Sequence, residues 1–205
     1  MSVGRQSSLA NTTGSFNAVL GNQAFAVNTT GSNNTALGYA ALYSNTTASN
    51  NTAVGYQAGY SNTTGTVNTY LGYYAGRNAT GSYAISIGYY AGYSNTEATY
   101  GNIFVGTQAG QNNTFGNSNI SIGSNAGTNT TTGNYNTFIG YQSGYTHNNT
   151  TGATYDVYVG YQSGFSTTTG YSSVYIGAEA GRSNTTGGFN VAVGRQRSEE
   201  HTSEL

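Results

Sequence analysis

Several residue types on which folding and chemistry often depend are absent from this chain, which has no cysteine, proline, tryptophan or lysine. Without cysteine there is no disulfide scaffold, no thiolate metal site and no cysteine nucleophile. Charged side chains are also scarce, at 5% of the 205 residues, against about 25% in an average soluble domain. The formal net charge is −1, so there is no basic surface of the kind that binds nucleic acid.

Long apolar runs are missing as well. No stretch approaches the ~18–20 apolar residues of a membrane helix, and no signal peptide opens the chain. Low charge can indicate disorder, but 13% aromatic residues argue against it. We therefore expect a folded chain that does not itself insert into a membrane.

What the chain does contain is an internal repeat. An aliphatic residue followed by glycine recurs along the sequence, and eight of the eleven spacings between these marker glycines are 17 residues. The marker glycines are Gly4, Gly21, Gly38, Gly55, Gly72, Gly88, Gly106, Gly123, Gly140, Gly160, Gly177 and Gly194.

Each repeat has the pattern of a short strand followed by turns. A β-branched residue precedes the aliphatic one by two positions in most repeats, as in Thr52 and Val54, which predicts a strand whose β-branched and aliphatic side chains are buried. Asn-Thr-Thr-Gly segments supply turns, and no helical stripe occurs. The repeat predicts an all-β parallel solenoid of about twelve 17-residue coils, each with two short strands, stacked at ~4.8 Å.

The quintets 34–38, 51–55 and 190–194 resemble the Ser-Val-Ala-Ile-Gly core of trimeric autotransporter adhesin heads (YadA-like heads). Similar repeats occur in tail-fibre-type surface proteins of phages and other viruses. The resemblance covers residues 1–196. It implies a left-handed parallel β-roll that forms a homotrimer, is located outside the cell, on a cell surface or on a virion, and attaches to glycans or to cell and particle surfaces. The family repeat is usually nearer 14 residues.

The two ends depart from the repeat. Met1 begins in mid-coil, and we expect residues 1–196 to be an uncapped fragment of a solenoid domain. Residues 197–205 break the pattern and match the translation of a common sequencing adapter, so we interpret them as an unstructured artefact. Without them, four arginines and three carboxylates remain and the net charge becomes +1.

Catalysis is not expected, and neither is a metal ion or another cofactor. The carboxylates before residue 197 fall in different coils, so no acid–base pair is indicated. We interpret Glu97 and Asp156 as solvated side chains, and His147 as a lone histidine in the longest turn. Ser143 and Ser163 replace the small residue that usually follows the marker glycine by three positions, which indicates packing. The chain is therefore predicted not to be an enzyme.

Aromatic residues form three columns in the repeat. One column lies just before the aliphatic residue (Tyr70, Phe104, Phe138, Tyr158, Tyr175), and strand alternation predicts that it points away from the interior. A second column lies five places after the marker glycine and contains Tyr43, Tyr60, Tyr93, Tyr145 and Phe165. The candidate surface-binding ladder directly follows the marker glycines and consists of Tyr39, Tyr56, Tyr73, Tyr89, Tyr141 and Tyr161.

Two roles stay open for these ladders: they stabilise the stack or a trimer interface, or they bind sugars and surfaces through flat apolar rings with polar tips. The leading hypothesis is a non-enzymatic surface fibre whose many weak contacts add up through avidity. One alternative is an ice-binding solenoid that uses a threonine ladder (Thr29, Thr46, Thr63, Thr130, Thr185), and a third is a structural matrix or filament protein. Asn-x-Ser/Thr sequons, including those at Asn11, Asn28, Asn45, Asn62, Asn129 and Asn184, are glycosylation sites if the chain is secreted by a eukaryote.

Overall fold

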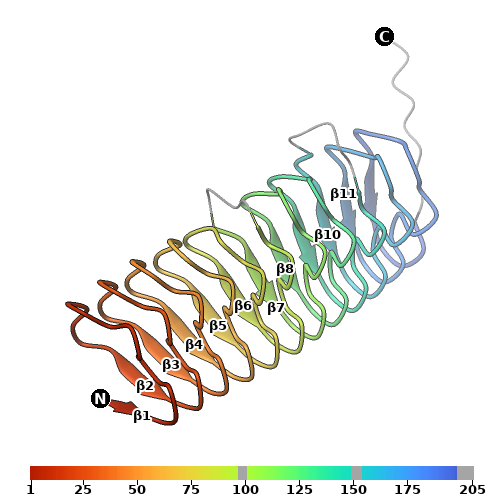
Figure 1. Cartoon of the computed structure of the whole chain (residues 1–205). Coiled ribbons are helices and arrows are strands. Elements are labelled where there is room, and N and C mark those ends of the chain that lie inside the picture. Colours follow the sequence, from red (N-terminus) through yellow and green to blue (C-terminus); the bar gives the residue numbers. More distant parts are fainter. Residues whose placement is uncertain (97–100, 149–153, 198–205) are drawn as a thin grey trace.

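The chain folds into a rod of coils stacked in sequence order from one end to the other (Figure 1). The computed structural model describes residues 1–96, 101–148 and 154–197. Its twelve strands are β1 (Ser2–Val3), β2 (Ala18–Leu20), β3 (Thr35–Leu37), β4 (Thr52–Val54), β5 (Thr69–Leu71), β6 (Ile85–Ile87), β7 (Ile103–Val105), β8 (Ile120–Ile122), β9 (Thr137–Ile139), β10 (Val157–Val159), β11 (Val174–Ile176) and β12 (Val191–Val193).

All twelve strands form one parallel sheet in which each strand pairs with the next along the chain. The register advances by one repeat per strand, so that Thr35, Thr52 and Thr69 are Cα partners. Eleven rises of ~4.8 Å make the sheet about 53 Å long. The predicted all-β parallel solenoid is confirmed. No helix occurs among the described residues, so none there is long and apolar enough to cross a membrane.

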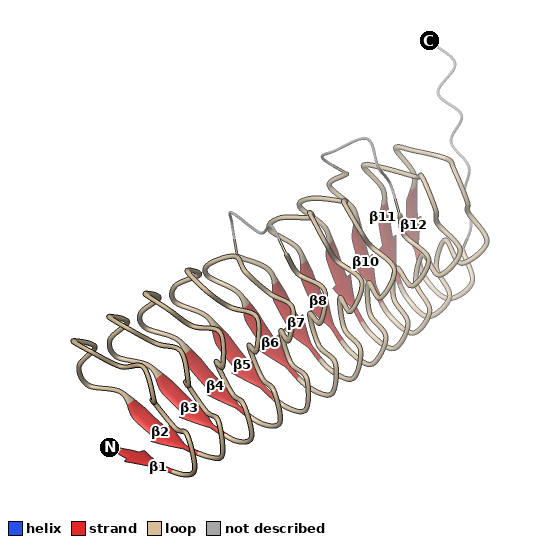
Figure 2. Ribbon diagram, viewed as in Figure 1, coloured by secondary structure: helices blue, strands red, loops and turns tan. Residues whose placement is uncertain are grey.

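The prediction of two strands per coil is wrong, because the described residues form one strand per coil (Figure 2). After the marker glycine, positive and negative φ values alternate along the backbone. Gln57 and Gly59, for example, have φ values of 50° and 60°. This segment still bonds to its neighbours: the Gln57 N–H donates to the Tyr39 carbonyl (2.8 Å), and the Gly59 N–H donates to the Ala75 carbonyl (3.0 Å). The coils are therefore joined on this side by hydrogen bonds between non-extended segments.

The marker glycine makes the turn between these two sides. Gly38 has a φ of +132°, and a Cβ there would lie 2.4 Å from the carbonyl oxygen of Gly55 in the next coil. Both the dihedral angle and the close approach of the backbone require glycine. The repeat therefore conserves this glycine because the stack leaves no room for a side chain.

The direction of the strand side chains is opposite to the prediction. The central strand residue points inward, whereas the residues on either side of it, including the aliphatic one, point outward and are half-buried or exposed. The five aromatic residues predicted to face outward are almost completely buried: Tyr70, Phe104, Phe138, Tyr158 and Tyr175. The small residues three places after the marker glycine pack tightly, as predicted, and are all fully buried: Ala24, Ala41, Ala58, Ala75, Ala91, Ala109, Ala126, Ser143, Ser163 and Ala180.

Two columns of polar side chains complete the interior. In the first, four residues before the marker glycine, the Oδ1 of Asn34 accepts the backbone N–H of Asn51, whose Oδ1 accepts that of Asn68, each at 2.9 Å. In the second, seven residues after the marker glycine, the Nδ2 of Asn45 donates to Asn28 Oδ1 at 2.9 Å. Most buried amides of the first column thus satisfy backbone groups of the adjacent coil, which is a condition for burying them.

Candidate binding surface

The tyrosines that follow the marker glycines form two stacked ladders on the surface. Ring centroids of Tyr39, Tyr56 and Tyr73 are 5.2 Å apart with interplanar angles of 12°, and Tyr73 and Tyr89 are 5.4 Å apart. Tyr141 and Tyr161 form the second ladder at 5.5 Å. The structure thus brings all six predicted residues to the surface, in one group of four and one of two. Because each ring lies on the next, a ring inside a ladder presents its edge and hydroxyl to water.

A second layer of tyrosines thickens the first ladder. Tyr74 lies 4.3 Å from Tyr73 and 5.0 Å from Tyr90, centroid to centroid. Hydrogen bonding to Tyr74, then loss of hydration, raises the pKa of Tyr73 to about 12. The Tyr73 hydroxyl is therefore a neutral donor and acceptor at physiological pH.

One cation is embedded in this aromatic region. The Arg77 guanidinium lies 5.1 Å from the Tyr60 ring and 5.3 Å from the Tyr74 ring, and its Nε donates to Gln57 Oε1 at 2.8 Å. A further ring, Tyr93, lies 6.0 Å away. These distances are those of cation–π contacts. Among the described residues Arg77 has no ion pair. The aromatic rings, Gln57 and Asn78, whose Oδ1 accepts from Arg77 Nη1 at 3.0 Å, hold the side chain in place.

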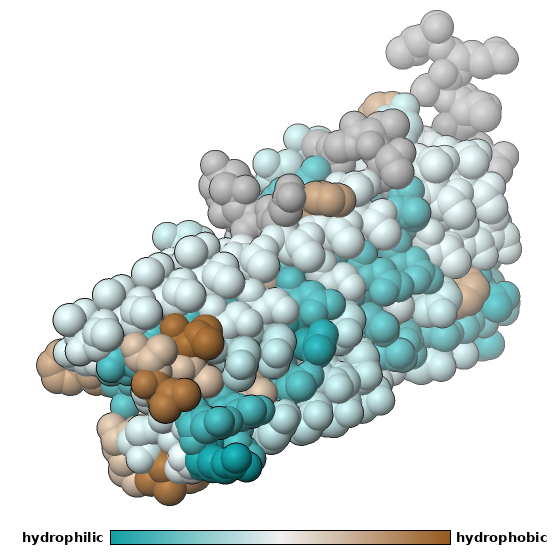
Figure 3. Space-filling model, in the orientation of Figure 1, coloured by the Kyte–Doolittle hydropathy of each residue, from teal (hydrophilic) through white to brown (hydrophobic). Residues whose placement is uncertain are grey.

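The outer sheet face is the other extended apolar feature. It consists of the first and third residues of β2–β12, which point away from the interior, and it runs the length of the rod. Leu20, Leu71, Ile122, Ile139 and Ile176 are each more than one-third exposed. In Figure 3 much of the visible surface is pale or teal, and the strongest brown lies at the N-terminal end, where Met1, Leu20 and Leu37 line an apolar hollow. Sequence reasoning missed this face because it placed these side chains inside.

The threonine ladder is real but excludes one of its predicted members. Thr29, Thr46 and Thr63 lie on one column, and Thr29 Oγ1 donates to the Thr46 carbonyl at 3.1 Å. Thr185 continues the column near the C-terminal end, where its carbonyl accepts from Thr168 Oγ1 at 3.0 Å. Thr130 instead belongs to the second buried polar column and is 2% exposed. The ladder hydroxyls thus bond the coils together.

The sequon asparagines differ in their accessibility. Asn28, Asn45 and Asn62 are completely buried in the second polar column and Asn184 is nearly so, whereas Asn11 is exposed and Asn129 half-buried. An oligosaccharide cannot be attached to a completely buried amide of the folded rod. Burial therefore contradicts the expectation of glycosylation at Asn28, Asn45 and Asn62.

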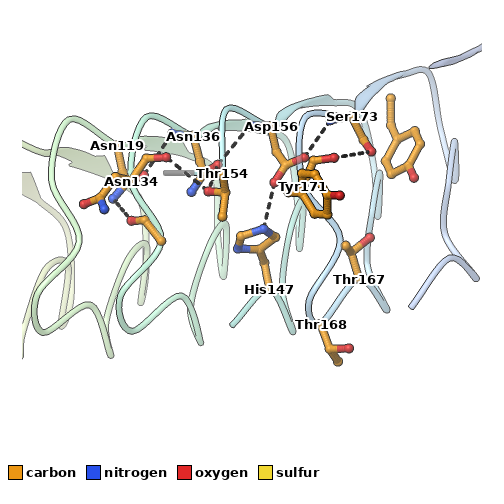
Figure 4. Close-up of polar contacts among 12 residues, drawn as sticks. Asn119, Asn134, Asn136, His147, Thr154, Asp156, Thr167, Thr168, Tyr171 and Ser173 are labelled. Atoms are coloured by element: carbon orange, nitrogen blue, oxygen red, sulfur yellow. Dashed lines mark hydrogen bonds and ion pairs between the residues drawn. The ribbon is translucent and has the colours of Figure 1, made fainter. Parts of the chain in front are cut away.

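The predictions for His147 and Asp156 are wrong, because both are completely buried and bonded to each other, His147 Nε2 to Asp156 Oδ2 at 2.9 Å (Figure 4). Asp156 occupies the first polar column, where its Oδ1 accepts the Ser173 N–H at 2.8 Å, as an asparagine would. Its Oδ2 stands where asparagine has an NH₂ group and therefore needs a donor, which His147 supplies from the second column. Elsewhere Asn102 and Asn95 make the corresponding contact at 3.2 Å.

This pair has no solvent access through which a substrate could reach it. No group of three or more metal-binding side chains exists among the described residues. Glu97 lies outside the described residues, as do residues 198–205 of the terminal segment, and Arg197 is exposed. The candidate binding features at the surface are therefore the tyrosine ladders, the aromatic rings around Arg77 and the outer sheet face.

Comparisons of the chain with protein-family models, with curated proteins and with solved structures find no match.

Proposed function

We propose that this chain is the rod of a non-enzymatic surface fibre, an adhesin or tail-fibre segment on a cell surface or virion. In this proposal, copies associate through the outer sheet face, and the tyrosine ladders attach the fibre to glycans. The observation that carries the proposal is the outer sheet face itself, an aliphatic stripe that follows the strands along the whole rod. Contiguous exposed apolar surface of this kind marks interaction sites.

The composition supports association of like chains. The face has no charged side chain on β2–β12, and it repeats at every coil, so a second copy of the same rod matches it in length and spacing. Burial of apolar surface contributes about 25 cal/mol per Å². The interior alone is thin, since much of it is filled by alanine and buried amides. Three copies are the number that the resemblance to adhesin heads implies.

The ladders suit attachment for a different reason. Tyrosine offers an apolar ring and a hydroxyl at little cost in conformational entropy, and stacking fixes the rings before any ligand arrives. A rod that repeats this arrangement and is present in several copies multiplies weak contacts into firm attachment. The paucity of charge makes the contacts insensitive to salt, which distinguishes them from electrostatic adhesion.

Light scattering on the purified chain tests the assembly. We expect a mass three times the 21.2 kDa of the chain. The substitutions Ile122→Glu and Ile139→Glu place charges on adjacent strands of the outer sheet face and should give monomers. Phe115→Glu is the control because Phe115 is also an exposed apolar side chain (49%, against 38% for Ile122 and 37% for Ile139) but lies in a turn. A wild-type monomer at micromolar concentration would contradict the assembly.

Attachment needs a separate measurement. We expect the fluorescently labelled rod to bind immobilised polysaccharides, with affinity nearly unchanged between 50 mM and 500 mM NaCl. Failure to bind any immobilised polysaccharide or cell surface would contradict the attachment role and would favour a structural filament.

A further inference from the structure

The aromatic surface is interrupted at one place along the rod. The coil that contains Tyr89 also presents Tyr90 and Tyr93, and three coils later Tyr141 and Tyr145 resume the pattern. The two coils between them carry no aromatic residue at any of these positions. They have instead hydroxyl and amide side chains, which are Thr107, Gln108, Gln111, Ser124, Asn125 and Thr128.

The interruption leaves two ring faces without a stacked partner. Tyr89 is stacked on Tyr73 on one side, and its neighbour on the other side is Thr107. Tyr141 is stacked on Tyr161 on its far side, and its near neighbour is Ser124. Tyr89 is 51% exposed and Tyr141 is 45% exposed, so solvent reaches both rings. These two rings therefore border the same two intervening coils, one on each side.

The space between them has a defined thickness. Tyr89 and Tyr141 are three coil rises apart, which is about 14 Å at ~4.8 Å per rise. Two rungs of the ladder are missing, so the interval accepts two flat rings at stacking distance, one against each tyrosine. Thr107 is exposed and Ser124 is half-buried, so short side chains form the floor.

The chemistry of the floor is polar and uncharged. Gln108, Gln111 and Asn125 are half-buried amides beside the two hydroxyl residues. No acidic or basic side chain occurs between residues 98 and 146. Aromatic walls with a few amides and hydroxyls are the lining that sugar rings require, because a pyranose has an apolar face and a rim of hydroxyl groups.

We propose that this interval, with Tyr89 and Tyr141 as its walls, is a binding site for neutral glycans in which one pyranose ring stacks on each tyrosine. The proposal rests on the glycan-attachment role above and gives it a location. It also makes a distinction within the ladder: Tyr89 and Tyr141 bind sugar through their faces, whereas Tyr56, with both faces covered, does not.

Filling the interval tests this assignment. The double substitution Thr107→Tyr and Ser124→Tyr continues the ladder without a break from Tyr39 to Tyr161, using the residue that other coils already carry there. We expect the wild-type rod to bind immobilised neutral glucose- and galactose-based oligosaccharides in preference to polygalacturonate. The filled variant should lose this binding while keeping its circular dichroism spectrum and melting temperature.

Two single substitutions keep the test decisive if the filled variant fails to fold. Tyr89→Ala should weaken binding of the same neutral oligosaccharides about tenfold or more, while Tyr56→Ala, the matched control, should change it less than twofold. Equal losses for the two variants, or binding by the folded filled variant, would overturn the site but leave glycan attachment intact. A wild-type rod that binds no oligosaccharide would overturn both, and preferential binding to polygalacturonate would overturn the site in favour of an acidic glycan near Arg77.

Discussion

The first and the later coils of this rod fill the same interior from opposite sides. In the coils of β2 and β3 the inward strand residues are Val19 and Ala36, and the space is filled by Phe25 and Leu42 from the segment after the marker glycine. In the coils of β7 and β9 the strand supplies the large residue, Phe104 or Phe138, and the opposite position is glycine.

The difference shows that what the coil requires is a volume, not a residue at a given position. In the β7 coil a Cβ on Gly110 would lie 2.3 Å from the Phe104 ring. In the β3 coil Leu42 occupies the same place, with a φ of 49° that matches the 56° of Gly110. Protein interiors are close-packed, so a large residue on one side demands a small one on the other.

The largest expected effect comes from breaking this complementarity. Gly110→Leu should destabilise the rod by more than about 4 kcal/mol for two reasons. The new side chain overpacks the core, and it stands at a left-handed backbone position that side chains disfavour. Phe104→Ala alone should cost about 3–5 kcal/mol through the cavity it leaves. The double variant recreates the pairing of Ala36 with Leu42, and we expect it to be more stable than either single variant in urea denaturation followed by circular dichroism.

The test has a clear contrary outcome. If the two losses simply add, the positions are independent and the volume rule fails. Leu42→Gly serves as the control, since it removes the large residue of the β3 coil without a compensating aromatic residue and should be destabilising.

Periodicity predicted the solenoid and the twelve coils, because marker glycines such as Gly38 are required by the backbone itself. Which strand side chains point inward could not be predicted in the same way. The sequence shows β-branched and aliphatic residues alternating with alanine or tyrosine, and hydrophobicity alone assigns the aliphatic residues to the interior. Only the complementarity with Gly76 or Gly110, several residues along the chain, reveals that Tyr70 and Phe104 point inward.

Other features were hidden for different physical reasons. Residues such as Gln57 and Tyr74 adopt positive φ without being glycine, so propensity predicts an extended strand where none forms. His147 and Asp156 are separated by a long turn, and their pairing is evident only once they are aligned with the asparagine columns. The tyrosine ladder was predictable because it needs only equal spacing. That Thr107 and Ser124 leave one face of Tyr89 and one face of Tyr141 without a stacked ring is evident only from the structure.

The next effect concerns the polar columns, which are asparagine-rich in the first half of the rod and contain the His147–Asp156 pair in the second. His147→Ala should cost about 3–5 kcal/mol, because it leaves the Asp156 carboxylate buried without its donor. The double variant His147→Asn with Asp156→Asn copies the contact of Asn95 and Asn102. It should recover most of that stability in thermal unfolding at pH 7, and a double variant as unstable as His147→Ala would contradict the proposed equivalence.

A smaller effect separates two inward aromatic residues. Tyr70 and Phe104 occupy equivalent places, but the Tyr70 hydroxyl is buried without a hydrogen-bond partner. Tyr70→Phe should therefore stabilise the rod by about 1 kcal/mol. Burial also raises the Tyr70 pKa above its ordinary value of 10.0. The unfolded chain thus releases this proton first, and stability falls as pH rises above 10, by up to about 1.4 kcal/mol per pH unit.

Urea unfolding at pH 8 and pH 11 checks both parts of this expectation. The Tyr70→Phe variant should lose less stability between the two pH values than the wild type does. Tyr83→Phe is the control for the loss of one tyrosine hydroxyl, because Tyr83 is exposed. An unchanged pH dependence for Tyr70→Phe would contradict the burial of its hydroxyl.

The smallest effect distinguishes two arginines placed alike in the two halves. Arg77 and Arg182 each follow their marker glycine by five residues, and each donates from Nε to a glutamine of the preceding coil, at 2.8 Å and 3.1 Å. Arg77 lies among three aromatic rings, whereas Arg182 lies over one, Phe165, at 5.7 Å. Cation–π contacts at exposed sites are worth about 0.5–1 kcal/mol each. Arg77→Gln should therefore lower the free energy of unfolding by about 1 kcal/mol and Arg182→Gln by about half of that or less. Equal losses would show that the shared glutamine bond, and not the number of rings, determines the contribution of these cations.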